Sequence, residues 1–191
     1  MNIGLWYPKS DNFDLIGFSD TDFSGCKVER KNTSDTCHFL GHSLVSWHSK
    51  KQNLVALSTA EAEYIAIGLC CAQILRMKQK LSDFDLSFEH VPIKCYNTSV
   101  ISISKNLVQH SRTKHIDIRH HFIRDHAQKG DITLEFVSTK DQLAHIFTKP
   151  LSEEQFFDIR RQLGVISLWS NVCLMNSWWI YFLIAWISCH M

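Results

Sequence analysis

The chain has 191 residues, which is enough for one domain of ordinary size with a further segment attached. Its 20 Lys and Arg residues nearly balance its 19 Asp and Glu residues, so net charge alone indicates no class of partner. With 45% hydrophobic residues and only 7 Gly and 3 Pro, the composition excludes a disordered, collagen-like or low-complexity chain. The 7 cysteines show no Cys-x-x-Cys spacing, and residues 1–10 lack the pattern of a secretory signal. We therefore expect an intracellular protein of the cytoplasm or nucleus, and not a secreted one.

Three antiparallel strands are expected first. Residues 13–18 (FDLIGF) form a plausible strand that runs directly into Ser19 and Asp20. Residues 36–40 and 43–48, separated by Gly41 and His42, have the pattern of a β-hairpin.

The strongest helix signal follows this hairpin. Ser58 and Glu61 have the spacing of a capping box, in which each side chain satisfies a free backbone amide at the start of a helix. From there to Leu81 the segment is apolar almost all round, which predicts a helix buried on several sides against a sheet.

The second half alternates strands and helices. We expect strands at 91–96 and 133–137, and helices at 98–105, at 113–128 and after a second capping box at 139–142. The resulting order, β-β-β-α-β-α-α-β-α, predicts an α/β fold with a five-stranded mixed sheet flanked by helices.

The composition divides the chain into three parts. Residues 1–150 are expected to form the α/β domain, residues 151–165 a short amphipathic helix, and residues 166–191 an apolar tail. The uncharged end of the tail is shorter than the roughly 17 to 25 residues that span a bilayer, so membrane attachment is a secondary hypothesis.

Two acidic positions are candidates for chemistry. Asp20 follows a buried strand, where turn chemistry is the simpler explanation. Glu61 is accounted for by the capping box, whereas Glu63 lies about 200° further round the helix. A carboxylate at the start of a buried segment is costly unless it is paired or binds a metal, although a solvent-facing acid near the helix N-terminus is the alternative.

Four blocks of sequence carry a resemblance to a known family. They are GFSDTDFSGC at 17–26, LVSWHSKKQNLVALSTAEAEYIA at 44–66, TKHIDIRHHFIRDH at 113–126 and VSTKDQLAHIFTKPL at 137–151. In order and spacing they resemble the ribonuclease H domain of copia-type retrotransposon Pol polyproteins, from about Leu5 to about Gly164.

The resemblance implies a specific chemistry. Members of that family hydrolyse the RNA strand of an RNA–DNA hybrid, with four carboxylates that hold two Mg²⁺ ions. Asp20 and Glu63 match the first two of these carboxylates and are therefore the expected catalytic and metal-binding residues.

The other two ligand positions depart from the family pattern. Tyr96 stands where the family has Asp in its C-D-N triplet, and His145 stands where it has Asp in L-A-D-I-F-T-K. A phenol is a poor ligand for Mg²⁺, and imidazole suits other metals better. Asp141, one helical turn before His145, could compensate, but we prefer a role as an acid at a helix N-terminus. Asp35 replaces a family Gly in what we take for a turn.

Basic residues provide candidate contacts with nucleic acid. The basic, His-rich segment at 105–129 favours phosphate contacts, and the alternative is a solvated charged face. Two lysines also follow Trp47 on the third strand, where the alternative is protection of a strand edge. The candidates are Lys50, Lys51, Arg112, Lys114, Arg119 and Arg124.

We therefore expect a ribonuclease H-like domain with little or no Mg²⁺-dependent cleavage. The alternatives are an active nuclease completed by Asp141, a module that binds hybrid without cutting it, and a non-functional or membrane-tethered remnant. The reverse transcriptase portion of the ancestral polyprotein is not recognised in this sequence.

Overall fold

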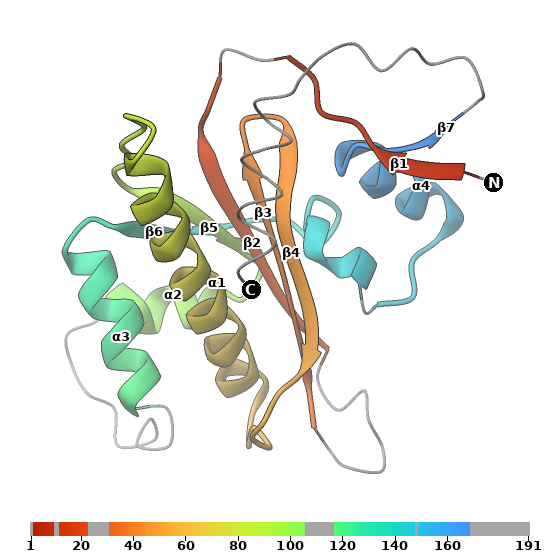
Figure 1. Ribbon diagram of the computed structural model, residues 1–191. Helices are drawn as coiled ribbons and strands as arrows, with labels where there is room; N and C mark the ends of the chain where they lie inside the picture. The colour runs from red at the N-terminus through yellow and green to blue at the C-terminus, as the bar shows by residue number, and fades with distance from the viewer. Residues whose placement is uncertain (1, 10–11, 23–30, 106–116, 148, 169–191) are drawn as a thin grey trace.

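The computed structural model describes residues 2–9, 12–22, 31–105, 117–147 and 149–168 (Figure 1). Its centre is a five-stranded sheet in the order β4-β3-β2-β5-β6. Strands β2, β3 and β4 pair antiparallel in chain order, whereas β5 and β6 run parallel to β2. The strands are β2 (Leu15–Asp22), β3 (Thr33–Leu40), β4 (Ser43–Lys51), β5 (Val91–Cys95) and β6 (Ile132–Phe136). The predicted mixed sheet is confirmed.

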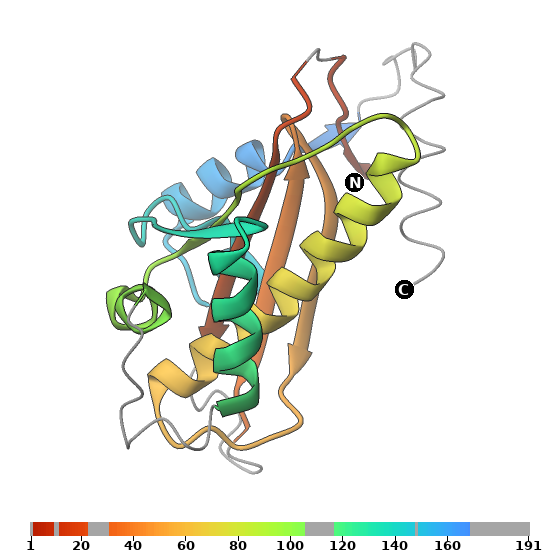
Figure 2. The ribbon, with the colours of Figure 1, turned by 90° about the vertical axis from the view of Figure 1, so that its left-hand side faces the viewer.

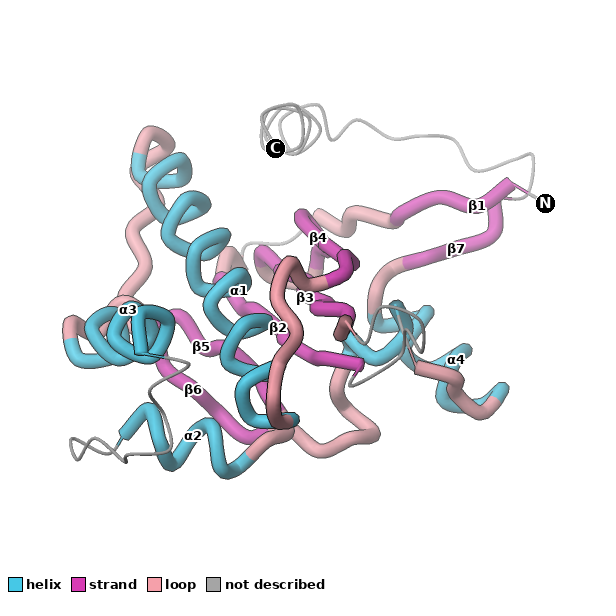
Figure 3. The backbone as a smooth tube through the Cα atoms, turned by 90° about the horizontal axis from the view of Figure 1, so that it is seen from below, coloured by secondary structure: helices cyan, strands magenta, loops and turns pink. Residues whose placement is uncertain are grey.

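The sheet separates two groups of elements (Figure 3). One face is covered by α1 (Thr59–Ser82), α2 (Thr98–Lys105) and α3 (Asp117–Gln128), with α1 running obliquely across the strands (Figures 1 and 2). The 3₁₀ helix η2 (Leu143–Phe147) and α4 (Glu153–Gln162) lie on the other side. Each side has its own buried apolar cluster, so the sheet is packed on both faces.

Strand β2 shows how alternation assigns side chains to these faces. Gly17 faces α1, and a Cβ atom added there would lie 2.8 Å from the Cys70 Sγ atom. Phe18 points the other way and its ring packs on Phe39, in the cluster beneath η2 and α4. Because side chains alternate along a strand, Asp20 lies on the same face as Phe18.

Helix α1 begins as the capping pattern predicts. The Ser58 hydroxyl accepts a hydrogen bond from the Glu61 backbone amide, at 3.1 Å. The Glu61 carboxylate accepts from the backbone amide of Leu57, one residue earlier than a strict capping box requires. The following turns are buried, as the apolar pattern indicates.

The helix expected after residue 139 is a short 3₁₀ helix and not an α-helix. Residues 139–142 form a turn, and only the short η2 follows it. The Gln142 side chain has two roles: its oxygen accepts from the Ala144 amide at the start of η2, at 3.4 Å, and its amide nitrogen donates to the backbone oxygens of Ser19 and Lys94. Pro150 then restricts the residue before it and stops further helical structure.

A second, two-stranded sheet was not predicted. It joins β1 (Asn2–Leu5) to β7 (Val165–Leu168), antiparallel, and each strand has only four residues. The expected tail at 166–191 therefore begins within a strand, whereas residues 169–191 lie outside the described part of the chain. Within the described part, no helix has the length and apolar character needed to cross a bilayer.

Candidate functional site

The structure brings the four family ligand positions together. Asp20 comes from β2, Glu63 from the second turn of α1, Tyr96 from the residue after β5, and His145 from η2. The His145 Nε2 atom lies 3.4 Å from Asp20 Oδ2, and the Tyr96 and His145 rings meet edge to face at 5.7 Å between centroids. The Tyr96 hydroxyl donates a hydrogen bond to the Glu63 carboxylate. The four side chains therefore meet in one largely buried cluster, which is called the pocket below.

The pocket forms where two parallel strands diverge. Strands β2 and β5 pair at Gly17 and Phe18, and this pairing ends before Asp20. The Gln142 side chain then bridges the gap, with its amide nitrogen 2.9 Å from the Ser19 oxygen and 3.3 Å from the Lys94 oxygen. Ligands of open α/β sheets bind beyond the carboxyl ends of parallel strands, and this pocket lies at that location.

Lys149 enters the same pocket, and sequence reasoning missed it. Its Nζ atom lies 2.8 Å from Asp20 Oδ1 and 3.2 Å from His145 Nε2. It also lies 4.6 Å from the centre of the Tyr96 ring, in a cation–π contact. Lys149 follows His145 by four residues in the recognised block, a spacing that places two residues on the same face of a helix. The sequence does not show that this face is turned toward Asp20.

Burial dominates the charge state of Glu63. The residue is 1% exposed, and desolvation raises the pKa of its carboxyl group from 4.5 to about 8. The Tyr96 hydrogen bond opposes this rise, the Asp20 charge adds to it, and Lys149 opposes it more weakly. Glu63 is therefore mostly protonated at neutral pH. The same surroundings raise the pKa of the Tyr96 phenol, first through burial and then through the Glu63 charge.

Asp35 is a further acid of the pocket that we had assigned to a turn. It lies within β3, directly opposite Asp20, and is fully buried. Side chains of directly opposed residues lie on the same face of a sheet, and its charge helps to raise the pKa of Glu63. The expectation of a turn was wrong because β3 continues through this position to Thr33. The register, which a single sequence does not display, decides this contact.

Asp141 does not reach the pocket. It is exposed, and its carboxylate accepts a hydrogen bond from the Ser138 hydroxyl at 2.7 Å. It thus closes the turn before η2 and supplies no replacement for the acid missing at His145.

The pocket does not fit two Mg²⁺ ions. Two of the four ligand positions carry a phenol and an imidazole in place of carboxylates. Of the two acids that are present, Asp20 forms an ion pair with Lys149. No group of three His, Cys, Asp or Glu side chains among the described residues is arranged to hold a metal ion. Mg²⁺ requires several oxygen ligands, so the residues present disagree with the metal that the family implies.

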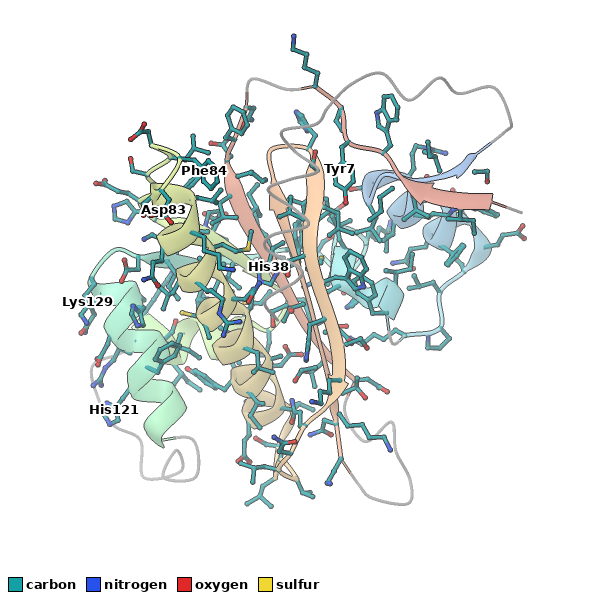
Figure 4. The ribbon with its side chains drawn as sticks, in the orientation of Figure 1. Tyr7, His38, Asp83, Phe84, His121 and Lys129 are labelled. Carbon is teal, nitrogen blue, oxygen red and sulfur yellow. The ribbon has the colours of Figure 1, made fainter. Side chains whose placement is uncertain are left out.

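The candidate nucleic-acid contacts lie on two separate surfaces. Lys50 and Lys51 are exposed at the end of β4, an edge strand of the sheet. Arg124 belongs to α3, beside α1 and α2 on the helical side, where it lies 2.8 Å from the labelled His121 (Figure 4). Only the backbone of Arg119 is described, and Arg112 and Lys114 lie outside the described residues. The described candidates therefore form no single basic patch.

Comparisons with known proteins agree with this geometry. A scan against protein families finds no match. The chain is 36% identical over 166 residues to the retrovirus-related Pol polyprotein from transposon RE2 of Arabidopsis thaliana, with 86% of this chain and 11% of that protein aligned. It is 33% identical over 153 residues to the corresponding polyprotein from transposon TNT 1-94 of Nicotiana tabacum, covering 80% of this chain and 12% of that protein. The chain thus spans about a tenth of the length of the curated relatives it matches.

A solved structure supports the fold. The N-terminal RNase H domain of a Mycobacterium tuberculosis protein, solved as a fusion with maltose-binding protein, superposes with a TM-score of 0.51 at 9% identity. The superposition covers 78% of this chain and 97% of that one. Over most of its length the chain is thus homologous to a short segment of copia-type retrovirus-related Pol polyproteins, and it has a ribonuclease H-like fold.

Proposed function

We propose that this chain is a retrotransposon-derived ribonuclease H-like domain that binds nucleic acid but has lost Mg²⁺-dependent cleavage of RNA in RNA–DNA hybrids. The observation that supports this loss is the chemistry of the pocket. Tyr96 and His145 occupy two of the four ligand positions, so only Asp20 and Glu63 still carry carboxyl groups there.

Hydrolysis by two metals needs one ion to activate water and another to stabilise the leaving oxygen. With carboxyl groups at only two of the four ligand positions, the two ions lack the oxygen ligands that they need. The pocket itself is preserved, because its four positions still converge and Gln142 still bridges the two strands. The loss is therefore one of ligand chemistry within a retained fold.

Binding of an RNA–DNA hybrid requires fewer specific groups than its cleavage does. Phosphate contacts from lysine and arginine provide most of the affinity of such interactions, and they tolerate the absence of a metal site. Lys50 and Lys51 are exposed at a strand edge and provide such contacts in this proposal. The polymerase that would supply hybrid to this domain must come from another chain or from sequence beyond this one.

The test is a hybrid cleavage assay on three proteins: the wild-type chain, the double variant Tyr96→Asp/His145→Asp, and a matched double variant Tyr7→Asp/His42→Asp outside the pocket. We expect no Mg²⁺-dependent cleavage by the wild-type chain or by the control, and measurable cleavage after restoration. Metal-dependent cleavage by the wild-type chain, abolished by Asp20→Asn, would contradict the proposal.

Binding is measured separately by fluorescence anisotropy with labelled hybrid in EDTA. Saturable binding that weakens with salt supports the binding module. Absence of binding by the folded wild-type chain would contradict that part and favour the remnant hypothesis.

A further inference from the structure

The small unit formed by β1, β7 and α4 carries an exposed apolar surface. Between 42% and 57% of each contributing residue is exposed, and the residues are Ile3, Trp6, Phe156 and Phe157. The rings of Phe156 and Phe157 lie edge to face, with 5.7 Å between their centroids. Large apolar side chains that gather in this way mark a surface that another segment or molecule covers.

The two-stranded sheet packs on α4 with one of its faces. On that face Leu5 pairs with Val165, and both pack against the buried cluster that includes residues of α4. The Arg160 side chain of α4 donates to the Ser167 hydroxyl at 3.0 Å, again on this face. Because side chains alternate along a strand, Ile166 points to the opposite face.

Trp6 extends this opposite face. Its amide donates to the Gly164 oxygen at 2.8 Å, so it continues the β1–β7 ladder by one residue. Among the described elements, only β1 and α4 have extensive contacts with β7, and Figure 3 shows both strands at the margin of the molecule. Two short strands are marginally stable unless further apolar packing supports them. The described part of the chain provides that packing on one face only.

The segment at residues 169–191 begins where β7 ends and has the composition of a cover. It contains no Asp, Glu, Lys or Arg. Even in the compact form of a helix, a segment of this length would measure roughly 35 Å, against about 13 Å for a strand of four residues. Its aromatic residues are Trp169, Trp178, Trp179, Tyr181, Phe182 and Trp186.

We propose that residues 169–191 fold back onto the β1–β7–α4 unit of the same chain and cover its apolar surface. Because the segment starts at β7 itself, its effective concentration at this surface is on the order of millimolar, well above that of a second copy in dilute solution. Its uninterrupted apolar run is shorter than the roughly 17 to 25 residues that span a bilayer, whereas a cover on the domain needs no such length. The inference is independent of the proposed function.

The experiment maps exposure by photochemical carbene labelling, read for each residue by mass spectrometry. Ile180→Asp/Ile184→Asp places two carboxylates in the apolar segment, and Ser170→Asp/Ser177→Asp adds the same charge at polar positions of that segment. Burial of unpaired carboxylates is costly, so we expect the first variant to detach the cover and to raise labelling of the apolar surface at least about threefold. The serine variant should label like the wild-type chain.

Two internal standards separate uncovering from loss of the fold. Leu57 and Phe136 are exposed elsewhere in the described part of the chain, so their labelling should be the same in all proteins. A reciprocal variant, Trp6→Glu/Phe157→Glu, keeps the test decisive if the first variant folds poorly. It places the charges on the surface instead, and labelling of the intact segment 169–191 should then rise by a similar factor.

Three results would overturn the inference. The first is labelling of the apolar surface that is the same in the wild-type chain and in Ile180→Asp/Ile184→Asp. The second is protection that disappears on dilution while light scattering shows a dimer becoming a monomer, because a second copy would then be the cover. The third is a surface that is labelled fully in buffer and protected only when phosphatidylcholine vesicles are added, because the occupant would then be lipid.

Discussion

Glu63 is the residue of the pocket whose charged form burial disfavours most clearly. It is buried near two other acids, Asp20 and Asp35, and has a hydrogen bond from Tyr96. Its Oε2 atom has no hydrogen-bond partner among the described residues, so the charged form is poorly compensated. The neutral form is favoured in the folded chain but not in the unfolded chain.

This difference makes stability depend on pH. The pKa of Glu63 is raised from 4.5 to about 8, so between these values the folded state holds a proton that the unfolded state has lost. The contribution of Glu63 to the free energy of unfolding therefore falls as pH rises through that range and is constant above it. We expect Glu63→Gln to remove this decline and to be more stable than the wild-type chain above the folded pKa, by at most about 5 kcal/mol.

Urea unfolding from about pH 5 to about pH 9 measures the effect. Glu153→Gln, which removes an exposed acid at the start of α4, is the control for the loss of one negative charge. If Glu63→Gln kept the same pH slope as the wild-type chain, Glu63 would not be protonated in the folded state.

Among the elements, the close contact between β2 and α1 helps to position the pocket. A Cβ atom at Gly17 would lie 2.8 Å from Cys70 Sγ and 2.9 Å from Ile74 Cδ1, so only glycine lets the helix approach this far. The helix also holds its neighbouring strand: His38, labelled in Figure 4, lies 3.4 Å from the backbone oxygen of Cys70. Both contacts fix the distance between Asp20 on β2 and Glu63 on α1.

We expect Gly17→Ala to lower the free energy of unfolding by about 1 to 3 kcal/mol, because the added methyl group overpacks this contact. Gly68→Ala is the matched control within α1, where nothing lies within 4 Å of an added Cβ. Alanine favours helix there and should stabilise the chain by roughly 0.5 to 1 kcal/mol. Chemical denaturation distinguishes the two signs, and equal effects from the two substitutions would contradict the proposed close approach.

At the scale of the whole molecule, the positions of the charges matter more than their sum. The net charge is only +1, yet Lys50 and Lys51 are exposed together at the end of the edge strand β4. Across β4, β3 and β2, Ser49 pairs with Asp35 and Asp35 pairs with Asp20. Lys50 and Lys51 are the next two residues of β4 after Ser49, so they lie at the end of β4 that is level with the pocket. Lys129, labelled in Figure 4, lies at the end of α3, across α1 from this edge.

We expect Lys50→Ala/Lys51→Ala to weaken hybrid binding and to lower its salt slope by about 2, one for each lost phosphate contact. Lys9→Ala/Lys129→Ala removes the same charge elsewhere and should leave that slope nearly unchanged. Anisotropy titrations at several salt concentrations give both slopes. Equal losses in the two double variants would show that binding follows net charge and not this edge.

Local patterns were sufficient for much of the fold. The apolar periodicity and the Ser58 cap predicted α1, and alternation and turn residues predicted the β3–β4 hairpin, because these signals act within a few residues. The family resemblance also identified Asp20, Glu63, Tyr96 and His145 as one site, and the structure shows that the four side chains meet. Their catalytic and metal-binding roles remain predictions.

Tertiary structure decided what depends on distant pairing. Asp35 joins the pocket through strand register, Lys149 reaches Asp20 across 129 positions of sequence, and β1 finds β7 at the other end of the described chain. The Gln142 amide donates to two strand carbonyl oxygens that only the fold brings close to it, while its side-chain oxygen accepts from an amide at the start of η2. The sequence by itself therefore determined most of the helices and strands, through local propensity, and the residues of the site, through their match to a family motif. Only the packed fold decided which charge neutralises that pocket, since burial and proximity arise when distant segments meet.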